Sequence, residues 1–283
     1  MLAAQLSRNS ESYRDPVSRI HWDRLNTRQY WLPPEAISLH GVPEFMALPE
    51  TDRMRLSHYE FLGFIEAGLW LEGTFMERIA RSMRQDIRNH AALKYRLHEL
   101  REETGHSLMF LELMERSGLS IPYRRHSRLR LANLFGRYAP LESLAFWTAT
   151  VIGEEIPDRL NRYIRHNSRQ VCATIVEMST LHLIDEARHI TYAREMVESR
   201  LARLSSWQRP LLQFLLRKLL RQFIDVFYYP DARLYELSGL YPGVEWTARA
   251  RSSPYRHEFM EQCLRPTLEI FRQRGFMLGN TLG

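Results

Sequence analysis

The spacing of hydrophobic positions predicts that this chain is built mainly from long helices. Over residues 57–83 apolar side chains recur every three to four positions, and Ser57 is a residue type that can cap a helix N-terminus. The same period returns over residues 87–114, and Gly118 follows where a helix would end. These two segments predict the first pair of long helices.

The same period predicts a second pair of long helices downstream. One covers about residues 141–164 and tolerates Pro157 as a kink, and the other covers about residues 168–201. Shorter helical patterns follow at residues 211–227, 231–237 and 255–274. Without any sheet-forming alternation, the pattern predicts an all-α fold, a four-helix bundle with additional peripheral helices.

The domain organisation follows from where this periodicity begins. Residues 1–50 contain five prolines and no sustained apolar period, so we expect an N-terminal tail and an extended arm. Residues 51–283 are expected to form a single helical domain, with the bundle core at about residues 56–202. A chain of 283 residues with 45% hydrophobic content can fill one large core.

Cysteine usage and hydropathy indicate a soluble cytoplasmic protein. Cys172 and Cys263 are too few for a disulfide framework and lack the spacing of a thiolate metal site. No stretch reaches the roughly 20 apolar residues that a membrane-spanning helix needs. We therefore expect a reducing compartment and no membrane association.

The net charge of +6 raises the question of an acidic partner. The densest basic patch comprises Arg124, Arg125, Arg128 and Arg130, which we interpret as a solvated connector between helices. An acidic carrier protein that delivers the substrate to this patch stays open as an alternative. Nucleic acid is not an expected partner, because no helix-turn-helix or aromatic stacking motif is present.

A stripe of candidate metal ligands lies on the predicted helix at residues 168–201. His182, Glu186 and His189 are separated by four and three positions, which places all three on one helix face. The helix at residues 87–114 carries a related Glu103-x-x-His106 motif. One such motif alone is weak support in a chain with 11 histidines.

An internal repeat strengthens this interpretation. Glu103 follows Glu72 by 31 residues, and Glu186 follows Glu155 by 31 residues, each with a histidine three positions further on. The repeat predicts two helix pairs, each of which donates one Glu from its first helix and a Glu-x-x-His motif from its second. This is the ligand set of a di-iron or di-manganese four-helix bundle.

The residue types suit that chemistry. Carboxylates bridge and neutralise two hard cations, and imidazoles add nitrogen ligands, although manganese accepts the same donors as iron. Buried without a metal, four carboxylates would repel one another. Glu66 competes with Glu72 as a ligand, and Glu154 competes with its neighbour Glu155; the repeat favours Glu72 and Glu155.

Further polar residues surround the predicted ligands. His182 has Glu99 as its counterpart in the repeat, so it is either a third imidazole ligand, which its place on the stripe favours, or a hydrogen-bonded core histidine. Glu99 itself adds a carboxylate that stays behind the ligands or alters the coordination of one iron. Glu102 and Asp185 precede ligand glutamates, and we expect Asp185 to accept a hydrogen bond from His106 and Glu102 to accept one from His189. The alternative is that both are solvated acids.

At these positions the chain resembles a known family of enzymes. The matching pattern is Glu72, Glu103-x-x-His106, Glu155 and His182-x-x-x-Glu186-x-x-His189. It resembles the AurF- and CmlI-like non-haem di-iron N-oxygenases, the family of p-aminobenzoate N-oxygenase, within the ferritin-like superfamily. The resemblance covers about residues 56–196, and the third histidine separates this family from other ferritin-like proteins.

The resemblance implies a function. It implies two iron ions, O2 as co-substrate, and conversion of an amine to a hydroxylamine, nitroso or nitro compound, in specialised-metabolite biosynthesis. It also implies a homodimer and an external reductase or other electron donor, because the sequence has no Gly-rich dinucleotide-binding fingerprint. The amine can be aryl or alkyl, and free or bound to a carrier protein.

Three other functions compete with N-oxygenation. The first keeps the iron pair but acts at carbon, as a hydroxylase, a desaturase or a C–C cleaving oxidase. The second is a ferritin-like protein that binds and oxidises iron or manganese, which the absence of an acidic channel and the nitrogen ligand His182 disfavour. The third, a basic helical binding module, rests on the charge alone.

Overall fold

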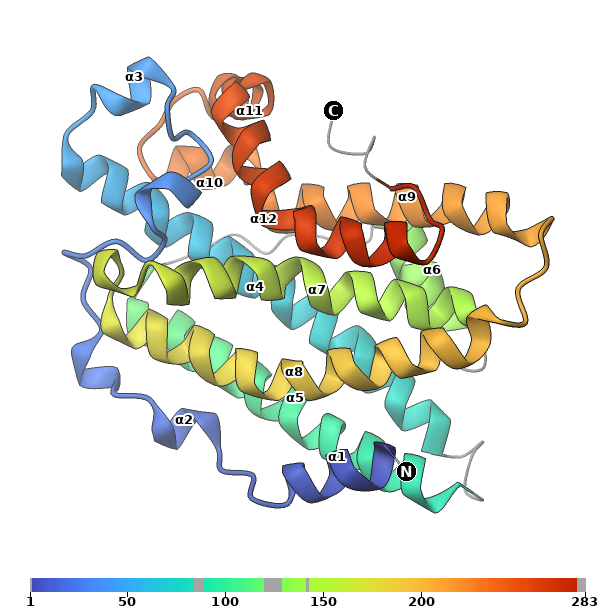
Figure 1. Cartoon of the computed structure of the whole chain (residues 1–283). Coiled ribbons are helices and arrows are strands. Elements are labelled where there is room, and N and C mark those ends of the chain that lie inside the picture. The colour runs from blue at the N-terminus through green and yellow to red at the C-terminus, as the bar shows by residue number, and fades with distance from the viewer. Residues whose placement is uncertain (1, 84–88, 120–128, 141–142, 279–283) are drawn as a thin grey trace.

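Four long helices form the centre of the molecule (Figure 1). The structure, a computed structural model, describes residues 2–83, 89–119, 129–140 and 143–278. The long helices are α4 (Glu50–Met83), α5 (His90–Ser117), α7 (Leu144–His166) and α8 (Ala173–Leu201). Helix α4 packs against α5, α7 packs against α8, and α5 contacts α8. The predicted all-α bundle is confirmed, and the described residues contain no strand.

The ends of these helices have local causes. The Asn89 side chain accepts a hydrogen bond from the Ala92 amide at the start of α5, and Gly118 ends α5 with a positive φ of 63°. The Ser143 hydroxyl accepts from the Phe146 amide and starts α7. Ser57 is not a cap, because α4 begins at Glu50; its buried hydroxyl instead accepts a hydrogen bond from the Trp31 amide.

The N-terminal region is packed on the bundle and is not an extended arm. It forms the short elements α1 (Leu2–Ser10), α2 (Pro16–Arg19), η1 (Trp22–Arg24), η2 (Pro34–Ala36) and α3 (Pro43–Met46). Three of its prolines occupy first helical positions, where the missing N–H group costs nothing. Trp31 and Leu39 are fully buried. The expectation of an extended arm was wrong because such short helices produce no apolar period.

Additional helices surround the bundle, as expected. They are α6 (Arg130–Tyr138), α9 (Gln208–Tyr228), α10 (Ala232–Leu237), α11 (Gly243–Ser252) and α12 (Pro254–Gln273), with the single turn η4 (Ser168–Gln170) before α8. Helices α9 and α12 pack on α7, opposite the side covered by α8 (Figure 1). Helices α6 and α11 were not expected. The predicted Arg-rich connector lies outside the described residues, except for Arg130, the first residue of α6.

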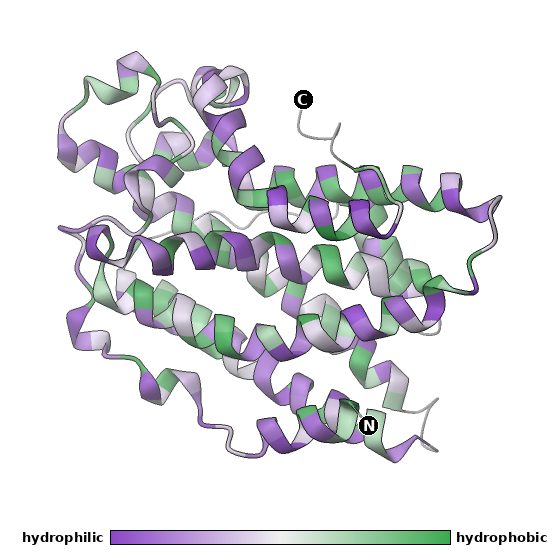
Figure 2. Cartoon of the chain, in the orientation of Figure 1, coloured by the Kyte–Doolittle hydropathy of each residue, from purple (hydrophilic) through white to green (hydrophobic). Residues whose placement is uncertain are grey.

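Hydrophobic and hydrophilic residues are interspersed along all four long helices (Figure 2). Their apolar faces meet in one continuous core that includes Leu62, Met109, Ile152 and Ile175. Acidic side chains interrupt this core at mid-height, because each long helix also buries at least one glutamate. Unpaired carboxylates are costly in such an interior, so their surroundings require an explanation.

Candidate metal centre

Buried carboxylates and imidazoles converge at the middle of the bundle. The side chains are contributed by all four long helices, and each residue is at most 8% exposed. Those predicted from the sequence are Glu72 from α4, Glu99, Glu102, Glu103 and His106 from α5, Glu155 from α7, and His182, Glu186 and His189 from α8. Asp185, also on α8, is more exposed, with 15% of its side chain accessible.

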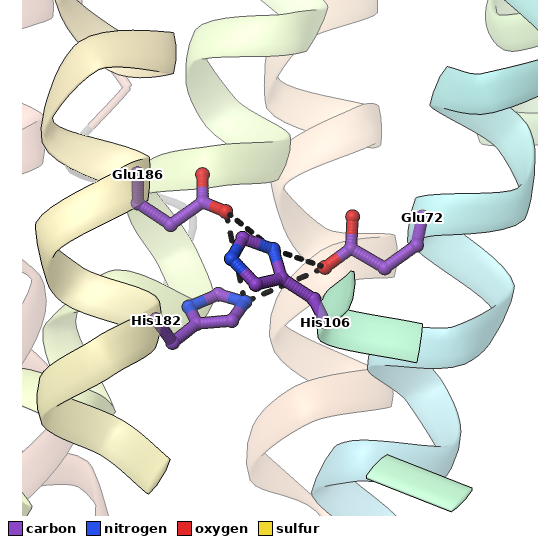
Figure 3. A group of neighbouring side chains, drawn as sticks. All are labelled: Glu72, His106, His182 and Glu186. Atoms are coloured by element: carbon purple, nitrogen blue, oxygen red, sulfur yellow. Dashed lines mark hydrogen bonds and ion pairs between the residues drawn. The ribbon is translucent and has the colours of Figure 1, made fainter. Parts of the chain in front are cut away.

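Four of these residues form a first group that could hold a metal ion (Figure 3). One ligand atom from each of Glu72, His106, His182 and Glu186 lies within 4.8 Å of the others. His182 Nε2 is 3.4 Å from Glu72 Oε1 and 3.6 Å from Glu186 Oε1. His106 Nδ1 is 3.4 Å from the same Glu186 oxygen. The two nitrogens and two oxygens thus face one point.

A second group adjoins the first. It contains Glu103, Glu154, Glu186 and His189, again with one ligand atom of each within 4.8 Å of the others. Glu186 belongs to both groups: its Oε1 faces the first, and its Oε2 lies 3.4 Å from His189 Nδ1. Glu103 also faces both, since its two oxygens lie 3.1 Å from His106 Nδ1 and 3.1 Å from His189 Nδ1. Two carboxylates therefore link the groups.

The residues present fit a pair of cations. Both oxygens of Glu186 and the Nδ1 atom of His189 are buried. None of these three atoms makes a hydrogen bond within the described structure. Their neighbours lie close enough, but the atoms point at a shared centre and not along hydrogen-bond directions. Carboxylate oxygens and imidazole nitrogens in this arrangement are suitable ligands for iron or manganese.

Electrostatics within the cluster point the same way. Burial raises the pKa of Glu72 well above its usual range, and the neighbouring Glu103 carboxylate raises it further. Burial and Glu186 do the same to Glu154. Burial and the neighbouring His106 ring lower the pKa of His182 to about 4. In the absence of a cation the cluster therefore retains protons on carboxylates, and a bound metal would displace them.

The structure corrects one predicted ligand. Glu155 belongs to neither group. Its carboxylate accepts hydrogen bonds from the guanidinium groups of Arg159 and Arg194, and the Thr267 hydroxyl donates to its Oε2 at 2.9 Å. Its neighbour Glu154 belongs to the second group instead. Adjacent residues on a helix point about 100° apart, so the 31-residue repeat selected the wrong neighbour.

The two carboxylates expected behind the histidines are in contact with them. His106 Nε2 lies 3.3 Å from Asp185 Oδ2, and His189 Nε2 lies 2.9 Å from Glu102 Oε2. Burial alone would lower the pKa of His106, but hydrogen bonds to Asp185 and Glu103 raise it to about 10. Each carboxylate therefore fixes which ring nitrogen faces the cluster, here Nδ1.

Two residues that contact a predicted ligand or the carboxylates behind the ligands were not anticipated. The Asn161 side-chain amide lies 3.3 Å from His182 Nδ1, so that this imidazole faces the cluster through Nε2. Arg188 contacts both Glu102 and Asp185. The position of Arg188, three residues after Asp185 on the same helix, could have indicated it. Asn161 carries no comparable sequence signal.

Comparison with known proteins identifies the family. The family model described as p-aminobenzoate N-oxygenase AurF matches residues 1–275. The chain belongs to the AurF family. This family comprises di-iron N-oxygenases, so the chain is an enzyme of that class, and its membership supports oxygenation at nitrogen over the alternative at carbon. The predicted resemblance is thereby confirmed.

Curated relatives of this AurF-family chain are distant. Uncharacterized proteins of Mycobacterium bovis and Mycobacterium tuberculosis strain H37Rv are each 22% identical over 227 residues, which cover 78% of this chain and 67% of theirs. One from Mycobacterium tuberculosis strain CDC 1551 is 23% identical over 200 residues, 69% of this chain and 59% of its own. No solved structure was found to match the chain.

A small cavity lies beside the second group of this AurF-family site. It has a volume of about 30 Å³, and Glu103, Glu154 and His189 form part of its wall. Aromatic and basic side chains complete the lining, among them Phe146, Trp147, Arg78 and Arg96, together with Glu99. Glu99 belongs to neither metal-ligand group, and burial raises its pKa to about 8. Within the described chain, no helix is long and apolar enough to cross a membrane.

Proposed function

We propose that this chain holds two iron ions in the buried cluster and uses O2 to convert a small amine into an N-oxygenated product. The observation that carries the proposal is the pair of adjoining ligand groups that share Glu186. Glu72, His106 and His182 would hold one ion, and Glu103, Glu154 and His189 the other. Glu186 would face both ions. Manganese could occupy the same donors.

The iron pair, once bound, would supply the chemistry of O2 activation. The protein's own contribution is to hold the ligands and to keep the site dry. Phe146 and Trp147, both 5% exposed, line the cavity with apolar surface. An amine in this cavity would lie against the second ligand group, where Glu103 and His189 would hold a metal ion. Glu99 would stay beside the site without binding iron.

The proposed substrate is an arylamine that carries an acidic group. Aromatic walls favour a flat apolar body, and Arg78 and Arg96 place positive charge on the same cavity. Because the cavity is small, the side chains around it must move to admit such a molecule. p-Aminobenzoate, after which the matched family is named, is the first compound to test.

We further propose an external electron donor and a homodimer, as the family resemblance implies. The reducing cytoplasm is the proposed location, in keeping with two cysteines that form no disulfide in the described structure. A carrier-bound substrate stays an alternative to a free one. Light scattering of the purified protein would test the dimer, which a monomer at all concentrations would contradict.

The proposed activity can be tested with reconstituted protein. The metal-free chain is loaded anaerobically with Fe2+, counted for iron, then given p-aminobenzoate or an alkyl amine, a chemical reductant and O2. Mass spectrometry should find oxygen attached at the amine nitrogen of one substrate. His182→Ala should abolish product, whereas His21→Ala, at an exposed surface ion pair, should not. Products oxidised only at carbon, or none with iron fully loaded, would overturn the proposal.

A further inference from the structure

Two histidines of the centre are backed by carboxylates that are themselves joined. His106 is in the first ligand group and His189 is in the second. Both present Nδ1 to the cluster and Nε2 to a carboxylate, Asp185 for His106 and Glu102 for His189. Each carboxylate uses only one of its oxygens for this contact, so the other is available.

Arg188 occupies both of those remaining oxygens. Its Nη2 atom donates to Glu102 Oε1 at 2.8 Å and also to Asp185 Oδ1. A continuous chain of contacts therefore runs from His106 through Asp185, Arg188 and Glu102 to His189. Glu102 is fully buried, and only 16% of the Arg188 side chain is exposed. A guanidinium presents several donors in a rigid plane, which suits it to this bridging position.

The positive charge of Arg188 is needed where it lies. Glu102 and Asp185 approach the same nitrogen atom, so two carboxylates share one small, mostly buried space. Without a cation between them, their mutual repulsion would turn at least one towards solvent. The imidazole in front of it would then lose the partner that sets its orientation.

We propose that Arg188 is a positioning residue that orients His106 and His189 together, so that one side chain couples the two metal positions. The inference rests on the proposed function, because it requires metal in both ligand groups. His182 lies outside this network, since its partner is Asn161. Loss of Arg188 should therefore weaken both metal positions at once, although Arg188 contacts neither metal.

Titration of the metal-free protein with Co2+ tests this, because cobalt absorption reports occupancy of each position without turnover. Arg188→Met should weaken binding at both positions, roughly tenfold or more at each, as loss of a partner behind a ligand does. Asp185→Asn should weaken mainly the position of His106, and Glu102→Gln mainly that of His189. Arg188→Lys, which keeps the charge, should recover part of the loss.

Two controls separate positioning from a merely structural role. Arg162 pairs with the buried Asp158 at 2.6 Å, so Arg162→Met removes a comparable ion pair and should leave cobalt affinity unchanged. In a double variant that already carries Asp185→Asn and Glu102→Gln, the addition of Arg188→Met should cause no further loss of cobalt affinity. Wild-type affinity in Arg188→Met, or weakening of one position only, would overturn the inference. If the wild-type chain fails to bind two cobalt ions, the proposed function fails instead.

Discussion

Glu103 and Glu186 are the two side chains on which the geometry of the centre depends most. Each carboxylate directs one oxygen at a nitrogen of the first group and the other at a nitrogen of the second. They come from different helices, α5 and α8, so they approach the shared space from two directions. Carboxylates placed this way can bridge two cations, which a single ligand stripe could not achieve.

Adjacent glutamates on α7 should respond in opposite ways to the same substitution. Glu154→Gln removes a ligand, so we expect weaker binding of the second metal ion, while the metal-free protein should be about as stable as the wild type, because burial and Glu186 raise the pKa of Glu154 and keep its side chain neutral there. Glu155→Gln leaves Arg159 and Arg194 without their anion and should lower the free energy of unfolding by about 1–3 kcal/mol.

Elemental analysis of the two variants after iron loading, and urea unfolding of the same variants without metal, would distinguish them. Normal iron content in Glu154→Gln together with loss of iron in Glu155→Gln would show that the sequence repeat had selected the correct residue after all.

A residue far from the metal groups gives a pH dependence. Burial raises the pKa of Glu60 to about 7, although Arg256 and Ser38 oppose this. Between the usual value of 4.5 and about 7, the unfolded chain releases this proton and the folded chain retains it. Stability therefore falls as pH rises through this window, by at most about 3.5 kcal/mol, because one pKa unit corresponds to about 1.4 kcal/mol.

Glu60→Gln should flatten that fall, because the amide does not titrate. Urea unfolding at several pH values between 4.5 and 8 would measure it. Glu44→Gln, at an exposed ion pair with Arg249, is the matched control and should retain the wild-type slope. An unchanged slope in Glu60→Gln would contradict the account.

At the scale of elements, long helices were predictable and short ones were not. The apolar period runs through enough turns in α4, α5, α7 and α8 to identify each one, and the ligand stripe on α8 could be read directly from residue spacing. The elements α1, α2 and α3 have nine or fewer residues, and contacts with the bundle rather than periodicity stabilise them. The choice between Glu154 and Glu155 depends on how α7 is rotated, which the packing of neighbouring helices determines.

The contact between the N-terminal segment and α5 depends on Gly105, which lies between Glu103 and His106. A Cβ atom there would lie 2.2 Å from the Tyr13 hydroxyl. Gly105→Ala should therefore displace Tyr13 and the adjacent Pro16 from α5, so that hydrogen exchange in α1 and α2 accelerates. Gly73→Ala is the control, because no described atom beyond its chain neighbours and the backbone of its own helix lies within 4 Å of a Cβ placed there. It should stabilise α4 by up to about 1 kcal/mol. Equal exchange in both variants would contradict this role.

At the scale of the whole molecule, we expect the cluster to make the free energy of unfolding depend on bound metal. The two ligand groups bring four buried carboxylates together, those of Glu72, Glu103, Glu154 and Glu186, in a core that is otherwise mostly apolar. Two cations would neutralise these charges and satisfy the unpaired atoms of Glu186. Metal binding and folding should therefore be linked, because the unfolded chain offers no preformed site.

Added metal should accordingly raise the unfolding temperature. At a free Mn2+ concentration 1,000-fold above the dissociation constant, the stabilisation is about 4 kcal/mol, or roughly 10 °C in Tm. Calorimetry with Mn2+ and with a chelator would measure it. Glu186→Ala should lose most of the shift, and an equal shift in this variant would indicate that the metal binds elsewhere.

The most direct test of the central claim is the iron content of the chain after anaerobic loading with Fe2+ and removal of loosely bound metal. The account predicts two irons per chain in the wild type and in Glu155→Gln, and fewer in Glu154→Gln. A wild-type chain that retains no iron, although it is folded and helical, would contradict the assignment of the buried glutamates and histidines as a di-iron centre.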